Sequence, residues 1–289
     1  MLESSDSKTI QNKLSFIKGT DIPLPSLVEI SNSGLCNRKC SFCPRSNPDY
    51  PDVHEFISNE LHYKLCSQLS ECGFEGVYVY AGFNEPLLHK KIYDHIREAR
   101  KFLPKARIEI ITNGDVLNIT RIKKLMESGL TTLSISVYDG PDDAKKLQEM
   151  CESVNLREDQ FIVRHRYLPP EENFGINLTN RGGMMENAGV KIKTLKKSLC
   201  QTCFYPSYDF FVDYNGDVLM CSHDWAKKNI LGNLTKQNFL DIWTSEKAMR
   251  SRKNLYEAKR NFAPCNVCDA KGDQIGSKHI EAWKNIEQA

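Results

Sequence analysis

The sequence lacks a long apolar segment, an excess of charge of either sign, and an N-terminus typical of secretion. No run approaches the roughly 20 apolar residues that a membrane-spanning helix needs. The 39 basic and 37 acidic residues give a net charge of only +2, which does not indicate binding to nucleic acid or to an anionic membrane. The first residues, MLESSDSKTIQNK, are polar and unlike a signal peptide. We therefore expect a cytoplasmic protein with neither kind of partner.

The cysteines do not fit a set of disulfides. Eleven is an odd number, and a reducing compartment disfavours such bonds. The three isolated cysteines are expected to be small buried hydrophobic residues. They are Cys66, Cys72 and Cys151. The others form two groups, one early and one late in the chain, and clustered cysteines in a reducing compartment indicate metal ligands. These are Cys36, Cys40 and Cys43, and then Cys200, Cys203, Cys221, Cys265 and Cys268.

Strand-like and helix-like segments alternate through the first half of the chain. Strands are expected at 26–31, 76–82, 106–114, 131–140 and 160–168. Helices are expected at 58–73, 89–102, 120–129 and 141–154. This regular alternation predicts an α/β fold of βαβ units with parallel strands. The pattern fits a parallel barrel and a doubly wound sheet equally well.

The pattern changes after Gly183. The segment MMENAGVKIKTLKKS resembles a linker with a basic run. We expect a β-hairpin at 208–221 that turns at Asn215-Gly216, and a helix at 235–259. The 289 residues are enough for one large or two ordinary domains, and the late cysteines predict a small second module.

The early loop contains three closely spaced cysteines, Cys36, Cys40 and Cys43, and no nearby histidine. A closed zinc site uses four ligands, and a fully ligated [4Fe–4S] cluster uses four cysteines. Three cysteines therefore favour a cluster with one open iron, to which a small molecule can chelate, over the alternative of structural zinc. Because the loop follows the first strand, we expect it at the carboxyl ends of the strands, where barrel active sites lie.

The spacing C-x3-C-x-aromatic-C, formed here with Phe42 as the aromatic residue, resembles the signature of the radical S-adenosylmethionine (radical SAM) superfamily. The resemblance implies a partial (β/α)6 barrel over 25–190, preceded by an extension over 1–24. It also implies that SAM binds to the open iron of a three-cysteine [4Fe–4S] cluster and is cleaved to a 5′-deoxyadenosyl radical. A small-molecule substrate and a flavodoxin or ferredoxin-type electron donor are implied as partners.

Further motifs extend the resemblance. AGFNEPLLHK (81–90) resembles the family's Gly-Gly-Glu-Pro stretch, except that Asn84 replaces the second glycine. TNRGG (179–183) resembles an Asn-Arg-Ala-Gly stretch, and Arg181, expected after a sixth strand, is implied to orient a substrate hydroxyl. Arg164 and Arg166 share one face of the fifth strand by the period of two. The cofactor-binding residues implied by the resemblance are Phe42, Asn84, Glu85, Asn113, Ser136, Arg164 and Arg166.

The late cysteines resemble the auxiliary-cluster module called SPASM, or its shortened form Twitch, over 191–289. The resemblance implies one auxiliary [4Fe–4S] cluster ligated by Cys203, Cys221, Cys265 and Cys268, since no cysteine follows to hold a second. A zinc ribbon fits the spacing alone. Cys200 is a spare ligand, a buried thiol or a hydrogen-atom donor.

Three functions remain open. A fully ligated cluster can exchange an electron but cannot bind substrate, which favours a dehydrogenase that converts a secondary alcohol of a carbohydrate- or cyclitol-like substrate to a ketone. The second hypothesis is a radical epimerase in which Cys200 returns hydrogen to a sugar carbon. Peptide maturation ranks third, because only about 25 residues precede the predicted barrel, too few for a leader-binding domain. A non-catalytic electron carrier has no use for an open iron.

Overall fold

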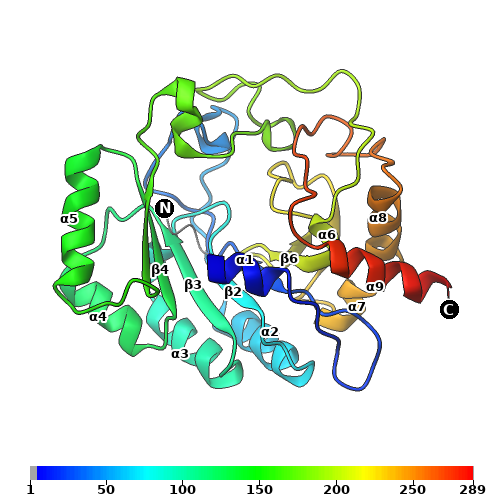
Figure 1. Cartoon of the computed structure of the whole chain (residues 1–289), viewed down its shortest axis with the longest axis horizontal. Helices are drawn as coiled ribbons and strands as arrows, with labels where there is room; N and C mark the ends of the chain where they lie inside the picture. The colour runs from blue at the N-terminus through cyan, green and yellow to red at the C-terminus, as the bar shows by residue number, and fades with distance from the viewer. Residues whose placement is uncertain (1–4, 289) are drawn as a thin grey trace.

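A single mixed sheet of eight strands organises the chain, in the order β5-β4-β3-β2-β1-β6-β7-β8 (Figure 1). The computed structural model describes residues 5–288. Strands β1 to β6 pair in parallel, and β7 and β8 add antiparallel at one edge. The strands are β1 (Leu27–Ile30), β2 (Val77–Tyr80), β3 (Arg107–Thr112), β4 (Thr132–Val137), β5 (Phe161–His165), β6 (Asp209–Val212), β7 (Asp217–Leu219) and β8 (Ile230–Asn233).

Helices follow the first four parallel strands or their loops, so the five predicted strands and four predicted helices of this half are confirmed. Side-chain caps fix where two of them begin: Ser58 Oγ accepts from Leu61 N and Asn118 Oδ1 from Arg121 N. The helices are α1 (Ser5–Gln11), α2 (Asn59–Glu71), α3 (Ile92–Phe102), α4 (Ile119–Glu127), α5 (Pro141–Glu152), α6 (Tyr205–Tyr208), α7 (Phe239–Trp243), α8 (Glu246–Tyr256) and α9 (Ser277–Gln288).

The two faces of the parallel strands have different roles. Residues of the outer face, such as Tyr78, Ile108 and Leu133, are fully buried in the main core with the apolar sides of α2 to α5. Residues of the inner face alternate with them, and Val77 and Val79 form a smaller cluster against which Ile10 of α1 packs. Helix α1 therefore covers the inner face at one end, and the carboxyl ends of the strands are left for a site.

The sixth parallel strand comes from the cysteine-rich part of the chain. Strand β6 pairs with β1, so that Leu27 lies opposite Asp209, and β7 completes the predicted hairpin, whose turn uses the positive φ of Gly216. The expectation that Arg181 follows a sixth strand is therefore wrong, because Arg181 precedes β6. Strands from both sides of residue 190, the predicted domain boundary, belong to this one sheet.

The predicted helix at 235–259 is two helices, and this expectation is also wrong. The chain breaks between α7 and α8, where Ser245 Oγ caps α8 by accepting from Ala248 N. The sequence did not predict α9. Its Trp283 and Trp243 of α7 enclose the guanidinium of Arg252, each ring centre lying 3.9 Å from Cζ. Among residues 5–288, none of the helices is long and apolar enough to span a membrane.

Candidate active site

The three early cysteines lie in the loop after β1 and share one cavity. Cys43 N donates to Cys40 O at 2.9 Å, which folds the loop into a tight turn. The cavity is also lined by residues that follow β2, β3 and β4, such as Glu85, Asn113 and Tyr138. This location at the carboxyl ends of the parallel strands is the one predicted for the loop.

The raised pKa values of these three thiols fit a site for a positively charged metal cluster. Burial, followed by the neighbouring Cys43 and Cys36, raises the pKa of Cys40 to about 12. Burial likewise raises the pKa of Cys36 and of Cys43. Three adjacent thiols that resist ionisation become thiolates only when a metal centre supplies positive charge. The residues present therefore fit a cluster that Cys36, Cys40 and Cys43 would hold.

Zinc does not fit this arrangement equally well. Within the described part of the chain, no group of three or more His, Cys, Asp or Glu side chains converges as the ligands of one metal ion do. The early loop supplies three cysteines where a closed zinc site uses four ligands, which favours an iron–sulfur cluster with one open iron there.

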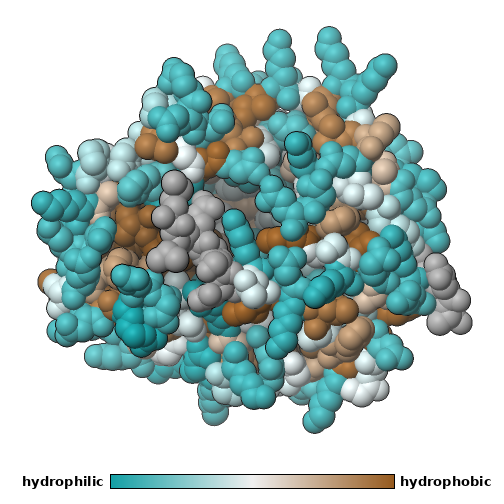
Figure 2. Space-filling model, viewed as in Figure 1, coloured by the Kyte–Doolittle hydropathy of each residue, from teal (hydrophilic) through white to brown (hydrophobic). Residues whose placement is uncertain are grey.

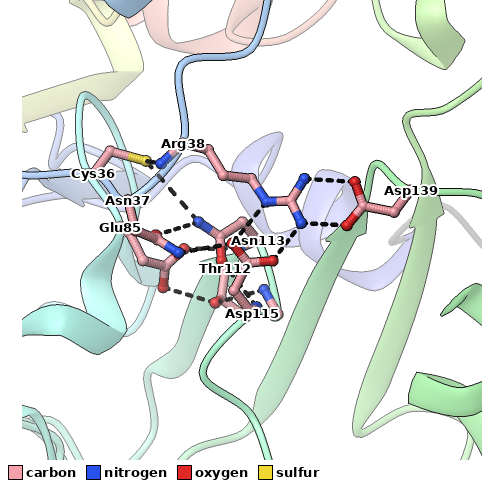
Figure 3. Close-up of polar contacts among 9 residues, drawn as sticks. Cys36, Asn37, Arg38, Glu85, Thr112, Asn113, Asp115 and Asp139 are labelled. Carbon is pink, nitrogen blue, oxygen red and sulfur yellow. Dashed lines mark hydrogen bonds and ion pairs between the residues drawn. The ribbon is translucent and has the colours of Figure 1, made fainter.

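An arginine inside the cysteine loop ties it to two neighbouring strands. Arg38 Nε donates to Asp115 Oδ2 at 2.7 Å, and Arg38 Nη1 donates to Asp139 Oδ1 at 2.9 Å. Figure 3 shows the guanidinium between the two carboxylates, which follow β3 and β4 respectively. The Arg38 backbone N–H also points to Cys36 Sγ at 3.5 Å. No pattern in the sequence indicates these ion pairs, because no periodicity relates residues so far apart.

The predicted cofactor residues Glu85 and Asn113 connect β2 to β3 at the edge of the cavity (Figure 3). Glu85 accepts from the Thr112 hydroxyl and from Asn113 N, each at 2.7 Å. Burial raises the pKa of Glu85, and these donors oppose the rise. Asn113 Nδ2 in turn donates to Asn37 Oδ1 at 2.7 Å, beside Cys36. Glu85 thus holds the cavity wall together as well as lining it.

The remaining predicted cofactor residues divide into those that reach the cavity and one that does not. Phe42, Asn84, Ser136 and Arg166 line it, but Arg164 does not. Asn84 donates to Ser33 Oγ at 3.2 Å, which holds it beside β1. Phe42 packs against Tyr138, with ring centres 5.9 Å apart and 21° between the planes. The two rings form an apolar wall of the cavity.

Arg181 lines the same cavity, although it comes from the segment between β5 and β6. Its neighbours fix its place. Asn180 Nδ2 donates to Val267 O at 2.7 Å, and a side chain at Gly182 would meet His223 O at 2.8 Å, besides the positive φ of that glycine. The segment that carries Arg181 therefore rests on the cysteine-rich part of the chain.

The sequence missed two carboxyl groups on the inner face of the sheet. Glu29 of β1 lines the cavity, and Asp209 of β6 lies on the same face of the adjacent strand. Both oxygens of Asp209 lack a hydrogen-bond partner among the described residues. Burial raises the pKa of Glu29 to about 7, against the lowering effect of Arg181. Burial and the nearby Glu29 raise the pKa of Asp209. Only the parallel pairing of β1 with β6 brings the two groups together.

The four late cysteines line a second, buried cavity. Each is less than one-tenth exposed. Burial, with the neighbouring cysteines, raises the pKa of Cys221 far above its ordinary range, so this site too needs positive charge to hold thiolates. The residues present fit a fully ligated auxiliary cluster, which Cys203, Cys221, Cys265 and Cys268 would hold. Other residues of the cavity wall include Tyr205, His223 and Arg260.

Arg260 is a further residue that the sequence did not identify. Its guanidinium is buried and donates to the Gln201, Thr202, Ala270 and Lys271 carbonyls at 2.6 to 2.9 Å. These carbonyls flank the first and the last cysteine of the auxiliary site, so one side chain joins its two ends. Its charge also lowers the pKa of Cys203 against the effect of burial.

Cys200 belongs to neither site. The residue is exposed, so it is not a buried thiol. It does not line the cavity that holds Arg181 and the early cysteines, nor that of the four late cysteines. The structure therefore does not place Cys200 where a hydrogen-atom donor to a substrate in the cavity would lie.

The fold and the two cysteine sites define an iron–sulfur protein built on a partial parallel barrel. Comparison with known families agrees. Residues 31–162 match the radical SAM superfamily, and residues 203–269 match SPASM, an iron–sulfur cluster-binding domain. The chain therefore contains a radical SAM domain and carries this second domain at its C-terminal side. Its cofactors are accordingly a [4Fe–4S] cluster with SAM and an auxiliary iron–sulfur cluster.

The chain also resembles individual proteins of known activity or structure. The chain is 29% identical to the S-adenosyl-L-methionine-dependent 2-deoxy-scyllo-inosamine dehydrogenase of Niallia circulans, over 84% of this chain and 92% of the relative. The crystal structure of BtrN in complex with AdoMet and 2-DOIA matches with a TM-score of 0.73 and 26% identity, over 89% of this chain and 97% of BtrN. Native anSMEcpe with bound AdoMet shares the fold, with a TM-score of 0.55 and 14% identity over 91% of this chain and 96% of that one.

Proposed function

We propose that this protein oxidises a secondary alcohol of a small cyclitol- or carbohydrate-like substrate to a ketone. One observation supports the proposal above all: Arg181 lines the cavity of the early cysteines while its own segment rests on the loop of the late ones. A substrate held by Arg181 would therefore lie between the two clusters. The dehydrogenase relative acts, by its name, on an aminocyclitol, which agrees with this substrate class.

The cofactors and the protein divide the reaction between them. When bound, SAM and the first cluster supply a 5′-deoxyadenosyl radical that removes hydrogen from the carbinol carbon, and the auxiliary cluster offers an acceptor for the remaining electron. Arg181 presents a fork of N–H donors that can orient the hydroxyl oxygen. Glu29, on the same cavity wall, offers a carboxylate oxygen that can take the hydroxyl proton. Asp209, on the same face of the adjacent strand, provides a second carboxyl group near Glu29.

The loss of two hydrogen atoms from the substrate tests this proposal. Anaerobic protein with both clusters is incubated with SAM, a chemical reductant and 2-deoxy-scyllo-inosamine, together with related aminocyclitols and polyols. We expect a ketone, detected by mass spectrometry and by hydrazine trapping, in amounts that match the 5′-deoxyadenosine formed. A product that has the mass of the substrate in H2O and one additional mass unit in D2O would instead identify an epimerase.

The pH dependence of turnover tests the role of Glu29. Because the pKa of Glu29 is raised to about 7, the carboxylate that accepts the proton forms only as the pH rises through 7. We therefore expect kcat to fall about tenfold for each pH unit below that value. Glu29→Gln should remove this acidic limb and lower kcat, while SAM binding stays near the wild-type level. An unchanged acidic limb in the Gln variant would exclude Glu29 as the proton acceptor.

A further inference from the structure

The basic run noted in the sequence lies directly against the cysteine loop of the first cluster. Val190 N donates to Ser41 O at 2.7 Å, and Gly189 N donates to Ser46 Oγ at 2.9 Å. The contact is close: a side chain at Gly189 would meet Ser41 Cα at 2.8 Å. Since Ser41 lies between Cys40 and Cys43, the start of the basic run is fixed beside the cluster ligands.

The end of the same run is attached to the auxiliary site. Leu195 N donates to Val267 O at 3.1 Å, and Val267 lies between Cys265 and Cys268. Between these two attachments Ile192 N donates to Met185 O at 3.1 Å. The segment 189–195 is therefore held in place over both cysteine loops, although it contains neither helix nor strand.

Four lysines project from this segment and its continuation. Lys191, Lys193, Lys196 and Lys197 are all exposed. Their ammonium groups form no ion pair or hydrogen bond with the described residues. Figure 1 draws this part of the chain in yellow-green along the upper edge, and Figure 2 shows hydrophilic side chains projecting from that edge. A concentration of unpaired positive charge beside a redox centre attracts negatively charged partners and accelerates their association.

We propose that this lysine segment, Lys191 to Lys197, is the docking surface for an acidic one-electron carrier protein of flavodoxin or ferredoxin type. The first cluster needs one electron for each SAM that is cleaved, and the donor must approach the loop of Cys36 to Cys43. The lysine segment is the basic surface attached to that loop. The segment leaves the cavity to SAM and substrate, because its lysines do not line it.

Charge reversal tests the docking surface with a reduced flavodoxin as the donor. The variants Lys191→Glu/Lys193→Glu and Lys196→Glu/Lys197→Glu are compared with Lys101→Glu/Lys123→Glu, which makes the same charge change on exposed positions of α3 and α4. We expect the flavodoxin concentration for half-maximal 5′-deoxyadenosine formation to rise about tenfold or more in the first two variants. The control should change less than about twofold.

Two further measurements make the result specific. With dithionite in place of flavodoxin, the rate of 5′-deoxyadenosine formation should be unchanged in all three variants, since a small reductant needs no docking surface. Direct titration of flavodoxin should show the same loss of affinity, and the wild-type affinity should fall with salt more steeply than that of the variants. Equal flavodoxin affinity in all variants would overturn the proposal, as would a dithionite-driven rate lost also in the milder Lys→Gln variants. SAM cleavage requires no substrate here, so this result does not depend on the proposed alcohol oxidation.

Discussion

Replacement of Cys36 with alanine is expected to reduce 5′-deoxyadenosine formation to background. Cys36 is one of three thiols that would hold the first cluster, and its loop is positioned by Arg38 and Asn113. With two thiolates left, the loop would no longer hold a cluster in the place where SAM would bind to its open iron. The measurement is the 5′-deoxyadenosine produced with dithionite and SAM alone, together with the iron and sulfide content of the anaerobic protein.

The matched control for this experiment is Cys72→Ala. Cys72 caps the end of α2, is half-buried and lies outside both cysteine groups. Its replacement should leave SAM cleavage and iron content at the wild-type level. If Cys36→Ala still forms 5′-deoxyadenosine at a rate within a few-fold of wild type, the early loop does not hold the catalytic cluster and the proposed function loses its basis.

Removal of an auxiliary ligand is expected to separate SAM cleavage from ketone formation. Cys221 follows β7 and is buried among the other three thiols of its site. In Cys221→Ala, the substrate radical would lose its electron acceptor while the first cluster and its loop remain. We expect 5′-deoxyadenosine to form within about tenfold of the wild-type rate and the ketone to fall below detection.

The complementary variant is Cys200→Ala. Because Cys200 is exposed and lies outside both cavities, its loss should leave ketone formation unchanged. The epimerase hypothesis requires the opposite pattern, with product lost in Cys200→Ala and retained in Cys221→Ala. Circular dichroism and the retained SAM cleavage of Cys221→Ala would show that the variant is folded, so that loss of ketone reports on electron transfer.

Local patterns in the sequence were sufficient for the strands and helices of the first half of the fold, and they also group the cysteines that we predict to hold the two clusters. The strands and helices up to β5 follow from hydrophobic period and from the glycines that end helices, signals that act over a few residues. The spacing of Cys36, Cys40 and Cys43 is equally local, because one loop carries all three, whereas the four late cysteines come from three separate segments. The helices predicted at 58–73 and 120–129, for example, begin within one residue of α2 and α4.

Contacts between distant segments were not predictable in this way. The four residues of β6 have the composition of a strand, but nothing in them indicates that β1, far earlier in the chain, is the partner. The neighbouring carboxyls of Glu29 and Asp209 depend entirely on that pairing. Arg38 and Arg260 likewise act on carboxylates or carbonyls that are remote in sequence. Each of these contacts is set by the tertiary fold, to which hydrophobic period and loop spacing are insensitive.

The hydrogen-bond ladder between β1 and β6 determines how the two redox centres can behave. One centre is carried by the loop after β1, and the other lies around the hairpin that β6 begins. If a flexible linker joined two separate domains, the distance between the two centres would vary, and electrons would tunnel between them only when they came close. Here the shared ladder attaches both centres to one sheet, which favours a constant spacing between them. Removing the later part of the chain, with β6 to β8, would expose the unpaired edge of β1 and favour aggregation of the remaining part.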